Sequence, residues 1–242
     1  MANHTSRQGP PGPITLAVDI GGSGVKMMLL DPKGKPLSDR LREPTPAPAT
    51  PAAMLAVMAE MKGKLLAFDR VSVGFPGVVK RGHTLTAHNL DSAWQGFALE
   101  GALETKWKKP VRVCNDAAVQ GFGAIQKTGV ELVLTFGTGL GSSLFTKGQL
   151  CPGLELAHHP WRKGKTYEDY LGHEALKKYG NKRWSRLVKK AIEQTSSLFN
   201  WDYLYIGGGN AEHIDFKLPD TVKIVSNEDG LLGGVALWDH DF

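Results

Sequence analysis

A strand, a glycine-rich turn and a second strand occur in this order twice in the sequence, about half a chain apart. The first copy spans residues 14–30, with Gly21, Gly22 and Gly24 in its turn, and the second spans residues 131–146. Apolar residues flank both turns, which is the pattern of a hairpin closed by glycine. The residues themselves are not repeated, so the pattern predicts two similar halves rather than a tandem repeat.

Helices and further strands fill the rest of each half. Apolar residues at helical spacing from Met54 to Leu65 and from Trp184 to Phe199 predict two helices that each bury one face. This alternation predicts an α/β protein of two lobes with a cleft between them, residues 14–115 and 116–242, after a disordered tail at residues 1–13. Other strands are expected at residues 35–42, 71–75, 111–115, 202–206 and 222–225, and other helices at 97–107, 117–125, 167–179 and 231–238, the last with the option of packing back on the first lobe.

Composition excludes several classes of protein. The chain of 242 residues is 41% hydrophobic and has two cysteines, Cys114 and Cys151, in unlike contexts. No disulfide framework is visible, which fits a reducing cytoplasm. No apolar run approaches the roughly 20 residues of a membrane span. The formal charge of +5 mildly favours an anionic partner.

The segment at residues 111–123 is the best candidate for a reactive site. A β-branched run ends there on Asn115 and Asp116, and small helix-forming residues follow. In α/β proteins, ligands bind outside the carboxyl ends of strands, so Asp116 is placed to touch a substrate. The alternative is that the pair only caps a helix, which Asn and Asp commonly do.

Three glycine clusters follow predicted strands, at residues 21–24, 137–139 and 207–209. Glycine lets backbone N–H groups converge on phosphate oxygens, so three such clusters favour a phosphate-binding cleft. Residues 137–141 do not match the dinucleotide fingerprint G-x-G-x-x-G. Residues 164–166 lack the first glycine of a P-loop, so both of those classes are disfavoured.

Five motifs together resemble the ROK family of sugar kinases over essentially residues 14–238. They are residues 19–26, 74–77, 115–116, 135–139 and 207–209. Gly-Ser-Gly in the first turn and residues 76–79, 89–94 and 134–139 are most similar to the polyphosphate glucokinases. The resemblance implies an actin-like (ribonuclease H-like) two-lobed kinase fold with an inter-lobe cleft, and a homodimer.

The resemblance also implies roles for individual residues. Asp116 would be the general base for the sugar 6-hydroxyl, for which a carboxylate of low pKa at a helix start suffices. Asp19 would hold Mg²⁺. The substrate-binding residues would be Asn89, Asn115, Glu155, His158 and Glu168, and the phosphate-binding residues Gly21, Gly22, Ser23, Gly24, Lys26, Thr138, Gly139 and Gly208.

Two departures from the family stand out. The loop at residues 155–158 reads Glu-Leu-Ala-His where the family often has Glu-x-Gly-His. Residues 160–167 contain no cysteine, so the structural zinc of many ROK proteins is not expected. The remaining candidates for a metal site, Cys151, His158, His159 and His173, match no zinc spacing.

The phosphoryl donor is left open between polyphosphate and ATP, and the acceptor between glucose and a related hexose. Polyphosphate would need a track of basic residues, although most basic runs are solvated surfaces. Alternatives are an ATP-dependent glucokinase or other hexose kinase, a non-catalytic sugar-binding protein, and a sugar-responsive regulator, whose DNA-binding domain does not fit before residue 14. Nucleic-acid and membrane partners are not expected. The candidate basic residues are Lys106, Lys108, Lys109, Arg112, Arg162, Lys163, Lys165 and those of residues 182–190.

Overall fold

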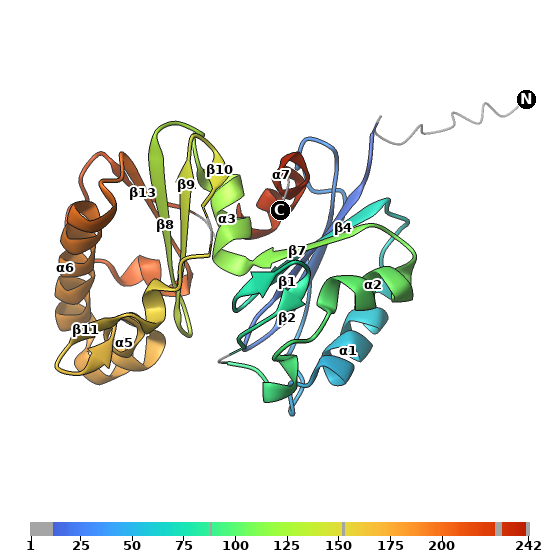
Figure 1. The fold of residues 1–242 in the computed structure, drawn as a ribbon, viewed down its shortest axis with the longest axis horizontal. Coiled ribbons are helices and arrows are strands. Elements are labelled where there is room, and N and C mark those ends of the chain that lie inside the picture. Colours follow the sequence, from blue (N-terminus) through green and yellow to red (C-terminus); the bar gives the residue numbers. More distant parts are fainter. Residues whose placement is uncertain (1–11, 88, 152, 226–228, 241–242) are drawn as a thin grey trace, which may run out of the picture.

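Two lobes, each built on a five-stranded sheet, form the protein in a computed structural model that describes residues 12–87, 89–151, 153–225 and 229–240 (Figure 1). The strand orders are β3-β2-β1-β4-β7 and β10-β9-β8-β13-β14. In the first sheet β1, β2 and β3 pair antiparallel, and β4 and β7 add in parallel beside β1. In the second sheet β8, β9 and β10 pair antiparallel, and β13 and β14 add in parallel beside β8. The predicted mixed α/β class and its two similar halves are confirmed.

The first lobe carries α1 and α2 on one face of its sheet. Met54, Met58 and Met61 of α1 are fully buried against that sheet. The helix begins after Thr50, whose hydroxyl accepts a hydrogen bond from the Ala53 N–H at 3.3 Å. The elements are β1 (Thr15–Ile20), β2 (Val25–Leu30), β3 (Leu41–Glu43), α1 (Pro51–Gly63), β4 (Arg70–Phe75), β5 (Val79–Lys80), β6 (His83–Thr84), α2 (Leu99–Trp107) and β7 (Val111–Asn115).

The second lobe carries α4, α5 and α6 on the outer face of its sheet. Trp184 and Val188 of α6 are fully buried there, as their helical spacing predicted. The elements are α3 (Asp116–Ala124), β8 (Val130–Phe136), β9 (Leu140–Thr146), β10 (Gln149–Leu150), β11 (Pro160–Arg162), β12 (Lys165–Thr166), α4 (Glu168–Leu171), α5 (His173–Tyr179), α6 (Asn181–Phe199), β13 (Tyr203–Gly207), β14 (Val222–Ile224) and α7 (Asp229–Ala236).

Two sequence predictions need correction. The third strand, expected at residues 35–42, is limited to β3. The helix expected at residues 167–179 is interrupted at Gly172, which has an extended backbone with φ −70° and ψ 172°. The interruption lets the His173 N–H donate to the Gly137 carbonyl at 3.0 Å, so the chain is held against a glycine turn of the cleft.

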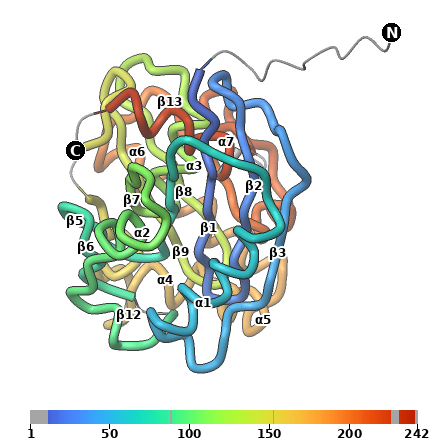
Figure 2. The backbone as a smooth tube through the Cα atoms, turned by 90° about the vertical axis from the view of Figure 1, so that its right-hand side faces the viewer, coloured from blue at the N-terminus to red at the C-terminus, as the bar shows by residue number. Residues whose placement is uncertain are grey.

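The inner helices α3 and α7 are exchanged between the lobes. Helix α3 follows β7 of the first sheet and packs on β8 and β9 of the second while also contacting β4, whereas α7 follows β14 and packs on β1, β2 and β4 of the first sheet. The two helices therefore lie side by side between the sheets (Figure 1) and behind the first lobe in Figure 2. The two helices are so close that a Cβ on Gly233 would overlap the Val119 carbonyl oxygen and lie 2.8 Å from the Gly123 nitrogen.

The chain beyond α7 fastens this arrangement. Trp238 donates from its indole N–H to the Ser72 hydroxyl at 2.8 Å, and the Arg112 guanidinium lies over the Trp238 ring at 4.7 Å. Arg112 also donates to the Leu237 carbonyl at 2.8 Å. Arg112, one of the candidate basic residues for the donor, therefore holds the C-terminal segment rather than facing the cleft.

No helix among the described residues is both long and apolar enough to cross a membrane. The tail expected at residues 1–13 lies outside the described residues except for Gly12 and Pro13, both of which are exposed.

Replacing Gly233 by alanine tests the contact between the two exchanged helices. Because the added methyl would meet backbone atoms rather than a flexible side chain, we expect Gly233→Ala to lower the free energy of unfolding by about 2 kcal/mol or more. Gly101→Ala in α2 is the control, since a Cβ there meets nothing within 4 Å. It should gain up to about 1 kcal/mol from helix propensity. Urea denaturation measures the free energy of unfolding of both variants. A Gly233→Ala variant as stable as the wild type would contradict the close contact between α3 and α7.

Candidate active site

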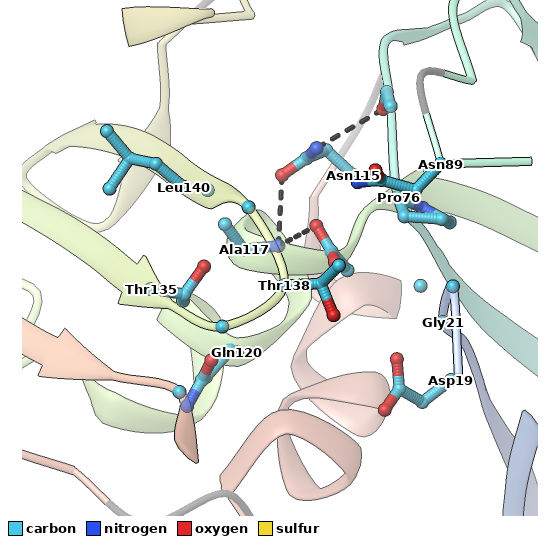
Figure 3. Close-up of a pocket in the computed structure, with 18 of the residues that line it drawn as sticks. Asp19, Gly21, Pro76, Asn89, Asn115, Ala117, Gln120, Thr135, Thr138 and Leu140 are labelled. Carbon is cyan, nitrogen blue, oxygen red and sulfur yellow. Dashed lines mark hydrogen bonds between the residues drawn. The ribbon is translucent and has the colours of Figure 1, made fainter. Parts of the chain in front are cut away.

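A cavity of about 320 Å³ lies between the lobes, where the carboxyl ends of β1, β4, β7, β8 and β13 meet. It brings together fourteen of the fifteen residues for which the sequence predicted a role; the exception is Gly24. Figure 3 shows Asp19 and Gly21 of the first lobe facing Thr138 and Leu140 of the second.

Asp116 sits at the floor of this cavity as the first residue of α3. A Cβ on Gly74 would lie 3.4 Å from its Cα, so the first sheet backs directly on it. Enclosure by protein raises the pKa of Asp116 to about 7, and the negative charges of Asp19 and Glu155 raise it further. The Ala117 N–H, which donates to the carboxylate at 2.8 Å, acts in the opposite direction and lowers the pKa. The expectation of a low pKa is therefore wrong, because burial outweighs the helix start.

Asn115 is the N-cap of α3. Its side-chain oxygen accepts hydrogen bonds from the N–H groups of Ala117 at 2.9 Å and Ala118 at 3.2 Å, and its amide donates to the Gly77 carbonyl at 3.2 Å. The capping alternative thus applies to Asn115, although both Asn115 and Asp116 line the cavity.

Polar side chains line the cavity beside the glycine turns. Glu168 accepts a hydrogen bond from the Leu140 N–H at 2.9 Å, and its carboxylate occupies the space that a Cβ on Gly139 would need. The His158 Nε2 lies 3.8 Å from the Glu155 carboxylate. Together with Asn89, these residues offer the mixed donors and acceptors that a polyol requires.

The turns of the two hairpins face each other across the cavity. In the first, the Gly21 N–H donates to the Gly24 carbonyl at 3.0 Å, and in the second the Gly137 N–H donates to the Gly139 carbonyl at 3.0 Å. Gly21, Gly22, Gly137 and Gly139 line the cavity, so the backbone of both turns borders the space in which a phosphate would bind. Gly24 itself is buried behind its turn, which is why it does not line the cavity.

A third turn closes the cavity at β13. Gly208 has a φ of 85°, and a Cβ there would overlap the backbone of Phe136, so only glycine fits. The Asn210 amide donates to the Gly137 carbonyl at 3.0 Å and its oxygen lies 3.2 Å from His173 Nδ1. These bonds tie the second and third glycine turns to each other.

Gln120 is a cavity residue that the sequence analysis missed. It lies four residues after Asp116, on the same face of α3, and is 8% exposed. Its amide lies against Gly207, and Figure 3 shows it beside Thr135. The i, i+4 spacing from Asp116 was the available signal.

Asp19 is the candidate ligand for a divalent cation. Its carboxylate opens on the cavity and pairs with the Lys26 ammonium at 2.7 Å. Mg²⁺ commonly binds one or two carboxylates together with substrate phosphates, so this residue fits. Within the described residues, no three His, Cys, Asp or Glu side chains form a metal site, and Cys151, His159 and His173 do not line the cavity.

Comparison with known proteins identifies the family. The model of the ROK family matches residues 15–160. The chain is 31% identical over 212 residues to the polyphosphate glucokinase of Mycobacterium leprae, covering 84% of this chain and 65% of that one. It is 29% identical over 234 residues to the polyphosphate glucokinase of Mycobacterium tuberculosis strain H37Rv, covering 89% and 88%.

Solved structures agree with this assignment. An inorganic polyphosphate/ATP-glucomannokinase from Arthrobacter sp. strain KM matches with a TM-score of 0.84 and 30% identity, over 95% of this chain and 100% of that one. A ROK glucokinase from Streptomyces griseus, solved with glucose and AMPPNP, shares the fold with a TM-score of 0.77 and 20% identity, over 93% and 98%. The chain therefore belongs to the ROK family and has the two-lobed fold of its sugar kinases.

Proposed function

We propose that this ROK-family sugar kinase transfers a phosphoryl group from polyphosphate, ATP or both to the 6-hydroxyl of glucose. The observation that carries the proposal is the position of Asp116, an enclosed carboxylate in a cavity that polar side chains and the glycine turns of both lobes also line. Similarity to polyphosphate glucokinases and to a polyphosphate/ATP-glucomannokinase supports the choice of donor and acceptor.

Asp116 acts in this proposal as the general base. It takes the proton of the sugar hydroxyl as the oxygen attacks the terminal phosphoryl group of the donor, and the P–O bond to the rest of the donor breaks, releasing ADP or a polyphosphate shorter by one phosphate. With a pKa of about 7, about half of the carboxylate is ionised at neutral pH, and the same pKa makes it a better proton acceptor than an exposed aspartate. Asn89, Glu155, His158 and Glu168 hold the sugar so that its hydroxyl reaches this carboxylate.

The turns at Gly21 and Gly139 bind the phosphates through backbone N–H groups, with Ser23, Thr138 and Lys26 beside them. Bound Mg²⁺ would neutralise phosphate charge at Asp19. Because four carboxylates line the cavity, at Asp19, Asp116, Glu155 and Glu168, a polyanionic donor needs these compensating charges.

The finer assignments rest on the same resemblance. We propose that the enzyme acts in the cytoplasm and as a homodimer. An ATP-dependent glucokinase and a kinase for mannose or another hexose are the alternatives, and the altered loop at residues 155–158 bears on the choice of sugar.

The first test is formation of glucose 6-phosphate by the purified protein with Mg²⁺, with ATP and long-chain polyphosphate run in parallel. Turnover with polyphosphate is the expected result. Turnover with ATP alone would overturn the polyphosphate assignment and leave the Asp116 mechanism standing, whereas no turnover with either donor would overturn the proposed reaction. Mannose in place of glucose, assayed through ADP release, tests the acceptor.

Asp116→Asn should lower kcat by about two to four orders of magnitude and leave glucose binding nearly unchanged. In the wild type we expect kcat/KM to fall about tenfold per pH unit below pH 7, because the base must be deprotonated. The residual activity of the variant should lack this limb. A pH–rate profile measures both, and near wild-type turnover in the variant would exclude Asp116 as the base.

The same substitution should stabilise the fold at neutral pH. Since the pKa of Asp116 is raised on folding, the folded state binds more protons than the unfolded state between about pH 4 and 7, and stability falls as pH rises through that range. We expect Asp116→Asn to raise Tm by several degrees at pH 8 and by less at pH 5.

Asp169→Asn is the control for this stability measurement. Hydrogen bonds from Thr166 lower the pKa of Asp169, so its substitution should lower Tm at pH 8. Calorimetry at pH 5 and pH 8 measures the Tm of both variants and of the wild type. A Tm below that of the wild type for Asp116→Asn at pH 8 would contradict the enclosure of this carboxylate.

A further inference from the structure

Strand register places Asp19, Lys26 and Arg42 in one row across the first sheet. Asp19 of β1 pairs with Gly74 of β4 and with Lys26 of β2, and Lys26 pairs with Arg42 of β3. Paired residues project from the same face of a sheet, and strands are about 4.8 Å apart. The row therefore extends from Gly74, which backs on Asp116, to Arg42 on the edge strand, two strand spacings or about 10 Å from Asp19.

Arg42 lies against the outside of the first phosphate turn. A Cβ on Gly24 would be 3.2 Å from Arg42 Nε and 3.6 Å from Nη2, so the guanidinium covers this buried glycine. The side chain itself is exposed. In the described part of the chain, Lys26 pairs with Asp19 and Lys64 with Glu43, but no ion pair includes Arg42.

The charges that line the cavity explain why a cation at Arg42 matters for binding a polyanion. Lys26 is the single lysine or arginine among the lining residues described, and its charge is shared with Asp19. A long polyanion bound at the turn extends beyond the cavity and needs further cations outside it. Arg42 is the next cation along the row, and a guanidinium binds phosphate oxygens with two parallel hydrogen bonds.

We propose that Arg42 binds distal phosphates of a polyphosphate donor, beyond the group being transferred, and so favours polyphosphate over ATP. The assignment rests on the proposed function, because it needs a donor long enough to span two strands. The phosphates nearest the transferred group bind at the turns, which both donors share. The part of the donor that differs between them is therefore the part that reaches Arg42.

Arg42→Ala tests this role against Lys217→Ala, which removes an exposed cation of the second lobe, outside the row and outside the basic runs named above. Two quantities are measured at constant salt: the KM for long-chain polyphosphate and for ATP, and the Kd of fluorescently labelled polyphosphate by anisotropy. We expect Arg42→Ala to raise the KM and Kd for polyphosphate about tenfold, and the KM for ATP less than twofold. The dependence of log Kd on log salt should become shallower by about one unit. Lys217→Ala should match the wild type.

The outcomes separate this inference from the proposed function. A wild type that uses polyphosphate while Arg42→Ala keeps its Kd would overturn the role of Arg42 and leave the function intact. An equal rise in KM for both donors would also overturn it, because Arg42 would then act on the shared phosphates. A wild type that neither binds nor uses polyphosphate would overturn the role of Arg42 together with the polyphosphate assignment, and turnover with ATP would then decide whether the sugar kinase reaction stands.

Discussion

The backbone contact between α3 and α7 fixes the geometry of the site. Each helix follows one sheet and packs on the other, so the pair joins the lobes at the point where Gly233 meets Val119. Asp116 is the first residue of α3, and its neighbours Gly74 and Asp19 belong to the sheet that α7 covers. The distance between the base and the first phosphate turn therefore depends on how closely these helices pack, and small residues at the crossing keep that distance short.

The same enclosure connects chemistry and stability. Asp116 is a better base because protein surrounds it and because Asp19 and Glu155 lie nearby, and each of these features disfavours its charge in the folded state. The carboxylate of Glu131 is buried but compensated. Glu131 is fully buried and accepts hydrogen bonds from the Gln126 and Thr128 N–H groups and from the Tyr205 hydroxyl. The contrast distinguishes a carboxylate held for structure from one whose charge is left costly, as functional sites commonly show.

Features set by local sequence were predictable and those set by distant contacts were not. The hairpins around Gly21 and Gly139 follow from alternation and glycine placement, and the stripe from Met54 follows from helical spacing. The interruption at Gly172 depends on a bond between His173 and the Gly137 carbonyl, which no local pattern reveals. The pKa of Asp116 was misjudged for the same reason, because the helix start is local whereas the enclosure and the charge of Asp19 come from other elements.

Basic residues show this limit most clearly. Runs such as residues 106–109 and 182–190 are conspicuous in the sequence, yet none of their side chains lines the cavity, and Arg112 is engaged by Leu237 and Trp238. Lys26 and Arg42 belong to no run. Antiparallel pairing of β2 with β3 makes them neighbours, and pairing of β1 with β2 sets them beside Asp19. A linear polyanion follows a line of charges in space, so strand register, rather than charge density along the chain, decides where such a ligand can bind.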